Sequence, residues 1–342
     1  MSVADLSAAG VLALDLGGTQ IRAACVRPGG EIVAARRSRT PVVDGGEAIV
    51  AACVAALSGV RDDLARLSQP PPVGVGISAP GPVDPRLGLI LDPPNLGRTF
   101  HDIPLAARIG EALSLPVALE RDTQVAALAE GRFGAAAGCE DFLYLTVSTG
   151  VGGAIFSGGR LLRGPDGTAG ELGHLVVDLH GSRCGCGMAG HLEAIASGSG
   201  IARRAREAAE RGESRLLADL VRERGAVFGA RDVADAEDAG DAVACRIMED
   251  GREAFAAALV SLTDVFNPTL IVVGGSLAAG QGDRLLGPAR AAIEHGAFRR
   301  PASRVTVVPA MLGDDVGLVG GLVLFCERFG EADGAGAAET RA

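Results

Sequence analysis

The segment VLALDLGGTQIRAACV, residues 11–26, decides the fold class of this chain. Its apolar stretches at 11–15 and 20–26 are typical of two short strands. The turn between them, Leu16-Gly17-Gly18-Thr19, contains glycines that supply the positive φ angles of tight connections. A second glycine turn at 28–30 leads into a third strand at 31–35. The segment therefore predicts an antiparallel β-meander.

A second segment, residues 142–163, repeats this plan with little identity in residues. Its strands and turns are expected at 142–147, 148–150, 152–156, 158–159 and 160–162. Helical segments follow each meander, at 46–67 in the first half and within 200–266 in the second. The remaining predicted elements are strands at 73–77, 117–120 and 270–273 and a last helix at 316–329. Two similar α/β halves with mixed sheets are implied.

The domain boundary is predicted near Pro116. A small lobe would hold residues 10–117 plus 313–330, because the last helix is free to return to the first half. A large lobe would hold residues 118–312. Residues 331–342 carry only small and charged side chains, so we expect a disordered tail.

Composition and charge exclude several classes of protein. The chain has 342 residues, 48% of them hydrophobic, but no run of about 18 uncharged apolar residues that could span a bilayer. A net charge of −10 argues against a nucleic-acid partner, since phosphate backbones select basic surfaces. Seven mostly isolated cysteines suit a reducing compartment. Asp15 interrupts the only apolar run near the amino terminus, so we expect no secretory signal and a cytoplasmic protein.

Two glycine loops are candidates for phosphate binding. Asp15 ends an apolar strand and is followed by Gly17, Gly18 and Thr19, an arrangement that offers a carboxylate for Mg²⁺, bare backbone N–H groups and a hydroxyl. The second loop offers Thr149, Gly150 and Gly152. Either loop alone is as typical of an ordinary hairpin, but two loops after two apolar strands favour a nucleoside triphosphate. Gly274 and Gly275 form a third loop, where an adenosine could approach the backbone.

Asp122 is the candidate catalytic base. It directly follows the strand expected at 117–120 and begins a helix, so it is equally suited to capping that helix. In phosphoryl transfer one carboxylate takes the proton of the attacking hydroxyl. Capping and catalysis are compatible.

A short segment carries a metal-binding pattern. Its candidate ligands are His174, Cys184, Cys186 and His191. Two thiolates and two imidazoles form a tetrahedral zinc set, and four protein ligands indicate a structural rather than a catalytic ion. His180 remains an alternative to His174. Glu171 and Glu193 flank the ligands, and a rigid zinc loop would orient these carboxylates toward sugar hydroxyls.

At these residues the sequence resembles the ROK family of bacterial glucokinases, other hexose and aminosugar kinases, and sugar-responsive repressors. The resemblance runs from Val11 to about Phe329. It implies a two-lobed actin-like ATPase (ribonuclease H-like) fold with an interlobe cleft, a catalytic Asp122 and phosphate contacts from the two glycine loops. It also implies ATP, Mg²⁺ and structural Zn²⁺ as cofactors and a homodimer. The sugar-binding positions that it implies are Gly81, Asn95, Arg121, Glu171, His174 and Glu193.

Four positions depart from the family pattern. His191 stands where the family has a third zinc cysteine, and Arg121 where its kinases have a sugar-binding asparagine. Gln124 replaces another common asparagine. No tryptophan follows the Asn95 loop, where Phe100 and His101 stand instead. The change at Arg121 bears on which sugar is bound.

The resemblance and the motifs together predict an ATP-dependent hexose kinase, with glucose phosphorylated at the 6-hydroxyl. A kinase for an aminosugar such as N-acetylglucosamine or N-acetylmannosamine is an alternative. A non-catalytic sugar-binding regulator is a second alternative, because the family includes repressors. A plain actin-like ATPase is a third, against which the zinc segment and its two glutamates speak.

Overall fold

The computed structural model describes residues 9–330, and the predicted tail at 331–342 lies outside this range. Contacts divide the described chain into two compact units. Unit 1 holds residues 9–133 and 314–330, and unit 2 holds residues 134–313.

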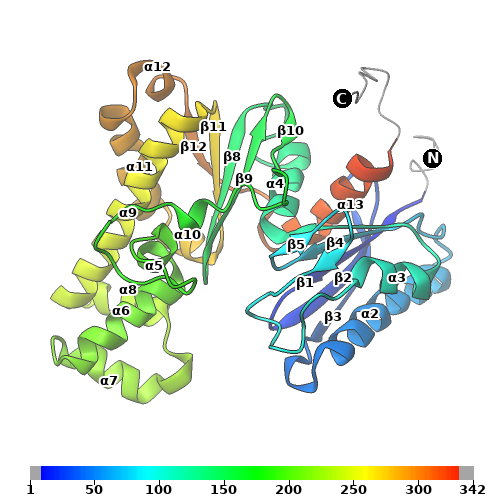
Figure 1. Ribbon diagram of the computed structural model, residues 1–342, viewed down its shortest axis with the longest axis horizontal. Coiled ribbons are helices and arrows are strands. Elements are labelled where there is room, and N and C mark those ends of the chain that lie inside the picture. The colour runs from blue at the N-terminus through cyan, green and yellow to red at the C-terminus, as the bar shows by residue number, and fades with distance from the viewer. Residues whose placement is uncertain (1–8, 331–342) are drawn as a thin grey trace. The chain divides into compact units, whose positions relative to one another are not determined.

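Unit 1 is built on a five-stranded sheet with the strand order β3-β2-β1-β4-β7 (Figure 1). β1, β2 and β3 form an antiparallel meander, and β4 and β7 continue the sheet in parallel with β1. The strands and helices of the unit are β1 (Val11–Leu16), β2 (Gln20–Val26), β3 (Ile32–Arg39), α2 (Gly46–Arg66), β4 (Val75–Ala79), β5 (Val83–Asp84), β6 (Leu89–Ile90), α3 (Leu105–Leu113), β7 (Val117–Arg121), α4 (Asp122–Phe133) and α13 (Val316–Phe329).

The alternation of side chains along β1 explains how unit 1 packs. Leu12, Leu14 and Leu16 point to one face of the sheet and join the core that includes α2. Val11 and Ala13 point to the other face and pack with α13. Alternation places successive side chains on opposite faces, so β1 is buried on both sides. The last helix of the chain thus returns to the first sheet.

Unit 2 contains a second five-stranded sheet with the order β10-β9-β8-β11-β12. Its antiparallel meander followed by two parallel strands matches the layout of unit 1. The elements are β8 (Phe142–Val147), β9 (Val151–Ser157), β10 (Arg160–Leu161), α5 (Leu192–Ala196), α6 (Gly198–Glu210), α7 (Arg215–Arg224), α8 (Ala230–Asp238), α9 (Ala242–Phe266), β11 (Leu270–Gly274), α10 (Ser276–Gln281), α11 (Asp283–Gly296), α12 (Arg299–Ala302) and β12 (Thr306–Pro309). The predicted repeat of the two meanders is therefore present.

The observed boundary differs from the expected one near Pro116. β7 pairs with β4 from Val117 to Arg121, so it extends the sheet of unit 1. α4 follows β7 and packs on α13. Residues 118–133, expected in the large lobe, therefore belong to unit 1. β12 was not foreseen, because its four residues carry too short an apolar pattern to distinguish a strand from a loop.

The cysteines in the described residues are all free thiols. Cys25 and Cys53 lie in the core of unit 1, where burial raises their pKa to about 11 and about 12 respectively. These thiols stay protonated at neutral pH and serve as apolar packing groups. Between residues 9 and 330, no helix combines the length and apolar character that crossing a bilayer requires.

Candidate functional site

Three parallel strands of unit 1 end at one edge of its sheet. The register pairs Asp15 on β1 with Ser78 on β4, and Ser78 with Glu120 on β7. The carboxyl ends of adjacent parallel strands are where α/β sheets bind ligands. The predicted residues Asp15, Gly81 and Asp122 therefore lie at or just beyond one edge.

Asp15 is held by two neighbouring strands. Arg22, its antiparallel partner on β2, donates from Nε (3.1 Å) and Nη2 (2.6 Å) to Asp15 Oδ2. Ser78 Oγ donates to Asp15 Oδ1 at 3.1 Å. A Cβ at Gly317, in the first turn of α13, would lie 2.8 Å from the Asp15 carboxylate. The carboxylate is thus fixed in position beside the amino end of α13, where the helix dipole favours negative charge.

The loops beside Asp15 depend on close approaches that only glycine permits. A Cβ at Gly18 would lie 2.9 Å from both Cβ and the carbonyl oxygen of Asn95, so the first glycine loop packs directly on the loop that carries Asn95. A Cβ at Gly81 would lie 2.9 Å from Cδ of Arg121. Unit 1 therefore brings together Gly18 with Asn95, and Gly81 with Arg121. Gly17 and Thr19 lie in the same tight turn, closed by a hydrogen bond from Gly17 N to the Gln20 carbonyl at 3.0 Å.

Asp122 and Arg121 are neighbours with opposite exposure. Asp122 is exposed at the start of α4, where its Oδ1 accepts from Thr123 N at 2.7 Å. Arg121 is only 3% exposed, and its backbone N donates to Glu120 Oε1 at 3.0 Å. Asp122 is thus a solvent-exposed residue, whereas the buried side chain of Arg121 lies against Gly81.

Unit 2 presents its own glycine loop at the corresponding edge. Residues 148–150 connect β8 to β9, and the register Val147↔Val151 makes the connection a three-residue turn. Ser148 Oγ lies 2.8 Å from Ser276 Oγ, directly after the Gly274-Gly275 pair. Gly275 has a φ of 96°, and a Cβ there would lie 2.4 Å from the Val147 carbonyl oxygen. The second and third glycine loops predicted from the sequence are therefore in direct contact.

These loops open onto a cavity of about 670 Å³ within unit 2. This volume falls in the usual range of small-molecule sites. Ser148, Thr149 and Ser199 line one part of it, and Phe228, Leu277 and Arg284 line another. The part of the cavity beside the glycine loops thus offers hydroxyls and backbone groups. The other part offers an aromatic ring, an aliphatic side chain and a cation. Such a lining suits a phosphorylated ligand with an aromatic base.

The four predicted metal ligands converge in unit 2. The donor atoms of His174, Cys184, Cys186 and His191 all lie within 4.8 Å of one another. His191 Nδ1 is 3.0 Å from His174 Nδ1 and 3.3 Å from Cys186 Sγ. In a tetrahedral zinc site with bonds of ~2.0–2.3 Å the ligand atoms lie roughly 3–4 Å apart, so the donor types and these two short spacings fit zinc. His180, the alternative to His174, is not part of this cluster among the described residues.

The two glutamates beside the metal set differ in their surroundings. Glu171 is exposed and immediately precedes the short turn Leu172–His174. Glu193, on α5, accepts from Val151 N at 3.0 Å through Oε2, and Cys184 Sγ donates to its Oε1 at 3.5 Å. Burial raises the pKa of the Cys184 thiol above its usual value. Glu193 thus contacts both the metal set and the second glycine loop.

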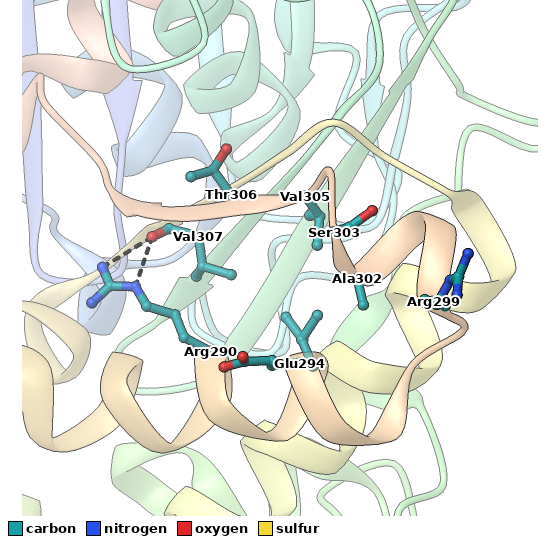
Figure 2. Close-up of a pocket in the computed structure, with 9 residues that line it drawn as sticks. Arg290, Glu294, Arg299, Ala302, Ser303, Val305, Thr306 and Val307 are labelled. Atoms are coloured by element: carbon teal, nitrogen blue, oxygen red, sulfur yellow. Dashed lines mark hydrogen bonds between the residues drawn. The ribbon is translucent and has the colours of Figure 1, made fainter.

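A separate cavity of about 460 Å³ lies at the outer edge of the same sheet, between α11, α12 and β12 (Figure 2). Arg290 lines it, extends from α11 to β12 and donates from Nε (3.0 Å) and Nη2 (2.9 Å) to the Val307 carbonyl. This arginine covers the outward backbone of the edge strand, which would otherwise be open to pairing. The cavity contains none of the predicted site residues.

Sequence reasoning missed the partners of the predicted residues. Arg22 could have been found from the hairpin register, because opposite charges on facing strand positions attract each other. Phe228 and Arg284 carry no local signal, since they reach the cavity from the loop before α8 and from α11, far apart in the chain.

The two five-stranded sheets with one strand order, each with a glycine loop after its first strand, define a protein of the actin-like ATPase fold class. The family model for the ROK family matches residues 11–328. The chain belongs to the ROK family.

Known relatives cover nearly the whole chain. A glucokinase of Halalkalibacterium halodurans is 37% identical over 310 residues, 90% of this chain and 92% of the relative. An N-acetylmannosamine kinase of Shigella flexneri is 34% identical over 315 residues, 92% of this chain and 97% of the relative. The structure of a ROK family glucokinase from Streptomyces griseus in complex with glucose and AMPPNP is similar, with a TM-score of 0.74 and 33% identity over 92% of this chain and 98% of that one.

Proposed function

We propose that this protein is an ATP-dependent hexose kinase that phosphorylates glucose at its 6-hydroxyl. The observation that carries the proposal is the exposed carboxylate of Asp122 at the sheet edge where Asp15 and the first glycine loop also lie. An exposed carboxylate beside a phosphate loop is the arrangement that a base for phosphoryl transfer requires. The similar glucokinase that binds glucose and AMPPNP supports the same activity.

In the proposed reaction, Asp122 takes the proton of the sugar hydroxyl as its oxygen attacks the γ-phosphorus of ATP and ADP leaves. Catalysis otherwise rests on positioning the reactants and stabilising charge. Gly81, Asn95 and Arg121 in unit 1 and Glu171, His174 and Glu193 in unit 2 are the proposed sugar-binding residues. The cavity lined by Ser148, Thr149 and Ser276 is the proposed nucleotide site of unit 2, with Gly150, Gly152, Gly274 and Gly275 shaping its loops.

Two ions accompany this proposal. The Asp15 carboxylate and the nearby Asp315, both within reach of Arg22, are a hard oxygen donor set that fits a hydrated Mg²⁺ held through water. That ion would neutralise charge on the phosphates. His174, Cys184, Cys186 and His191 fit a structural Zn²⁺, which would fix the fold of their loop.

The identity of the sugar depends on residues around Arg121. Its side chain lies against Gly81, so it restricts the space beside that loop. The similarity to an N-acetylmannosamine kinase keeps an aminosugar substrate as the second candidate. We further propose that the protein is a cytoplasmic homodimer, and light scattering of the purified protein would test the dimer. We also propose that it has no nucleic-acid partner, in accord with its net charge of −10.

The experiment is a coupled ADP-release assay with Mg·ATP and glucose, mannose, N-acetylglucosamine or N-acetylmannosamine. We expect turnover that requires added sugar and is fastest with glucose. Fastest turnover with an aminosugar would replace glucose as the substrate. No turnover with any sugar, together with a sugar-dependent rise in melting temperature, would overturn the kinase and favour a sugar-binding regulator.

A further inference from the structure

The backbone of Val151, directly after the second glycine loop, is contacted on both sides by the metal-binding segment. Its N–H donates to Oε2 of Glu193 at 3.0 Å. Its carbonyl oxygen lies so close to Gly173 that a Cβ on that glycine would be 2.0 Å away. Gly173 immediately precedes the ligand His174, and Glu193 is two residues after the ligand His191. The backbone of one residue is thus held between the two ends of the metal set.

Glu193 also contacts the metal set itself. Cys184 Sγ donates to Oε1 of Glu193 at 3.5 Å, while Oε2 accepts the hydrogen bond from Val151 N. The Glu193 carboxylate therefore joins one of the metal ligands to the backbone of the loop. A Cβ on Gly150 would lie 2.6 Å from Oε2, which shows how closely the carboxylate approaches the loop.

The same segment continues to the proposed nucleotide cavity. Five residues after Glu193, Gly198 N donates to the Ser148 carbonyl at 2.8 Å, and Ser199 N donates to the Thr149 carbonyl at 3.0 Å. Ser199 Oγ donates to the same Thr149 carbonyl at 2.7 Å. Ser148, Thr149, Gly198 and Ser199 all line the cavity. The backbone of the loop is therefore positioned by the chain that leaves the metal set.

We propose that the metal centre of unit 2 controls nucleotide affinity, and that Glu193 is the positioning residue that transmits its state to the loop at 148–151. The proposal rests on the assignment of this cavity to ATP. Metal at His174, Cys184, Cys186 and His191 fixes both ends of the segment that holds Val151, so the loop is ordered before the nucleotide arrives. By linkage, nucleotide binding raises metal affinity by the same factor.

The test compares ADP binding by calorimetry to zinc-loaded and chelator-stripped full-length protein. Metal removal should weaken ADP binding by about tenfold, within the range of allosteric couplings. The ratio of interest is the ADP dissociation constant of the stripped protein divided by that of the zinc-loaded protein. In Glu193→Ala this ratio should fall to about one. The loaded state of this variant is prepared at saturating zinc, because its zinc affinity is expected to drop about 10–100-fold. Glu193→Gln retains an oxygen that can accept from Val151 N, so it should restore most of the ratio. Glu207→Ala, at an exposed position on α6, is the matched control and should keep the full ratio.

Hydrogen exchange of the peptide that covers residues 148–153 gives a readout that needs no nucleotide. Metal removal should speed exchange at Val151 about tenfold in the wild-type protein but not in Glu193→Ala. If Glu193→Ala does not fold, Gly150→Ala takes its place, because the added Cβ displaces Oε2 from the loop.

The outcomes separate the two proposals. The coupling between metal and nucleotide is overturned if metal removal changes ADP affinity and hydrogen exchange in Glu193→Ala as much as in the wild-type protein. It is also overturned if wild-type protein binds zinc but metal removal changes neither quantity. Both outcomes leave the proposed kinase activity intact. Absence of ADP binding in both metal states overturns the nucleotide assignment. A metal-dependent exchange that Glu193→Ala abolishes would in that case still support control of the loop.

Discussion

The two sheets share one strand order but differ in what they present after the first strand. On β1, Asp15 faces Arg22 across the hairpin, and the pair forms a short ion pair. At the corresponding register position of unit 2, Thr146 faces Gly152. No pair of opposite charges occupies this position in unit 2, and the backbone of the second loop is held by Glu193 and by the start of α6.

This difference teaches that a repeated scaffold need not repeat its chemistry. Strand order places a loop at the carboxyl edge of each sheet, and the side chains there decide what the loop does. Unit 1 supplies carboxylates and a cation, which act by charge. Unit 2 supplies ordered backbone and a metal set, which act by shape. Variants at the two edges should therefore fail in different ways.

The largest effect is expected from Asp122→Asn in unit 1. Loss of a general base lowers turnover by about 10²–10⁴-fold, while an isosteric amide leaves the dissociation constants of sugar and ADP within about threefold. Steady-state ADP release and calorimetry measure the two quantities. Glu111→Gln, an exposed residue on α3, is the control. Wild-type turnover in Asp122→Asn would remove this residue as the base.

The next largest effect is a loss of stability that tests how closely the backbone packs in unit 2. Gly173→Ala places a Cβ 2.0 Å from the Val151 carbonyl oxygen, a clash that only a backbone shift relieves. Its free energy of unfolding should fall by about 3 kcal/mol, the upper end for overpacking. Gly185→Ala, in the same metal-binding segment but with no atom within 4 Å of the new Cβ, should change it by less than about 0.5 kcal/mol. Denaturant titration of both variants checks the difference, and equal losses would contradict it.

A third variant tests charge in unit 1 by removing the partner of Asp15. Arg22→Gln eliminates a guanidinium 2.6 Å from the carboxylate, a contact of about 1.5–3 kcal/mol. Turnover should fall about tenfold because the carboxylate loses its fixed position. The Mg²⁺ concentration for half-maximal rate should also fall, because a competing cation is gone. Arg160→Gln, at an exposed position on β10, is the control, and a raised Mg²⁺ requirement in Arg22→Gln would refute this reasoning.

The smallest effect concerns the pH dependence of metal binding in unit 2. Burial raises the pKa of the Cys184 thiol, so the metal-free thiol is protonated at neutral pH and must lose its proton to bind zinc. Zinc affinity should therefore rise with pH, by about tenfold per pH unit for each proton released. Competition with a chromophoric chelator between about pH 6.5 and about pH 7.5 measures the slope. A flat profile would show that the thiolate is already present in the metal-free protein.

Much of the local structure could be predicted because its signals lie within short segments. The strands at 20–26 and 142–147 and the helix at 316–329 have the bounds expected from their apolar periods. The four metal ligands also converge as a set, since their spacing in a glycine-rich segment leaves few other partners. The boundary near Pro116 could not be placed, because pairing of β7 with β4 joins strands about 40 residues apart. Such long-range pairing leaves no mark in local composition.

By itself, the sequence determined the repeated meanders, the glycine loops and the chemistry of the metal set, because turn residues, strand periods and donor types are local properties. Only the tertiary structure decided that Ser78 also holds Asp15 and that Arg121 is buried against Gly81. It also decided that Glu193 joins the metal set to the second loop. These contacts depend on strand register and on the close approach of distant backbones, which arise only when the sheets and helices pack.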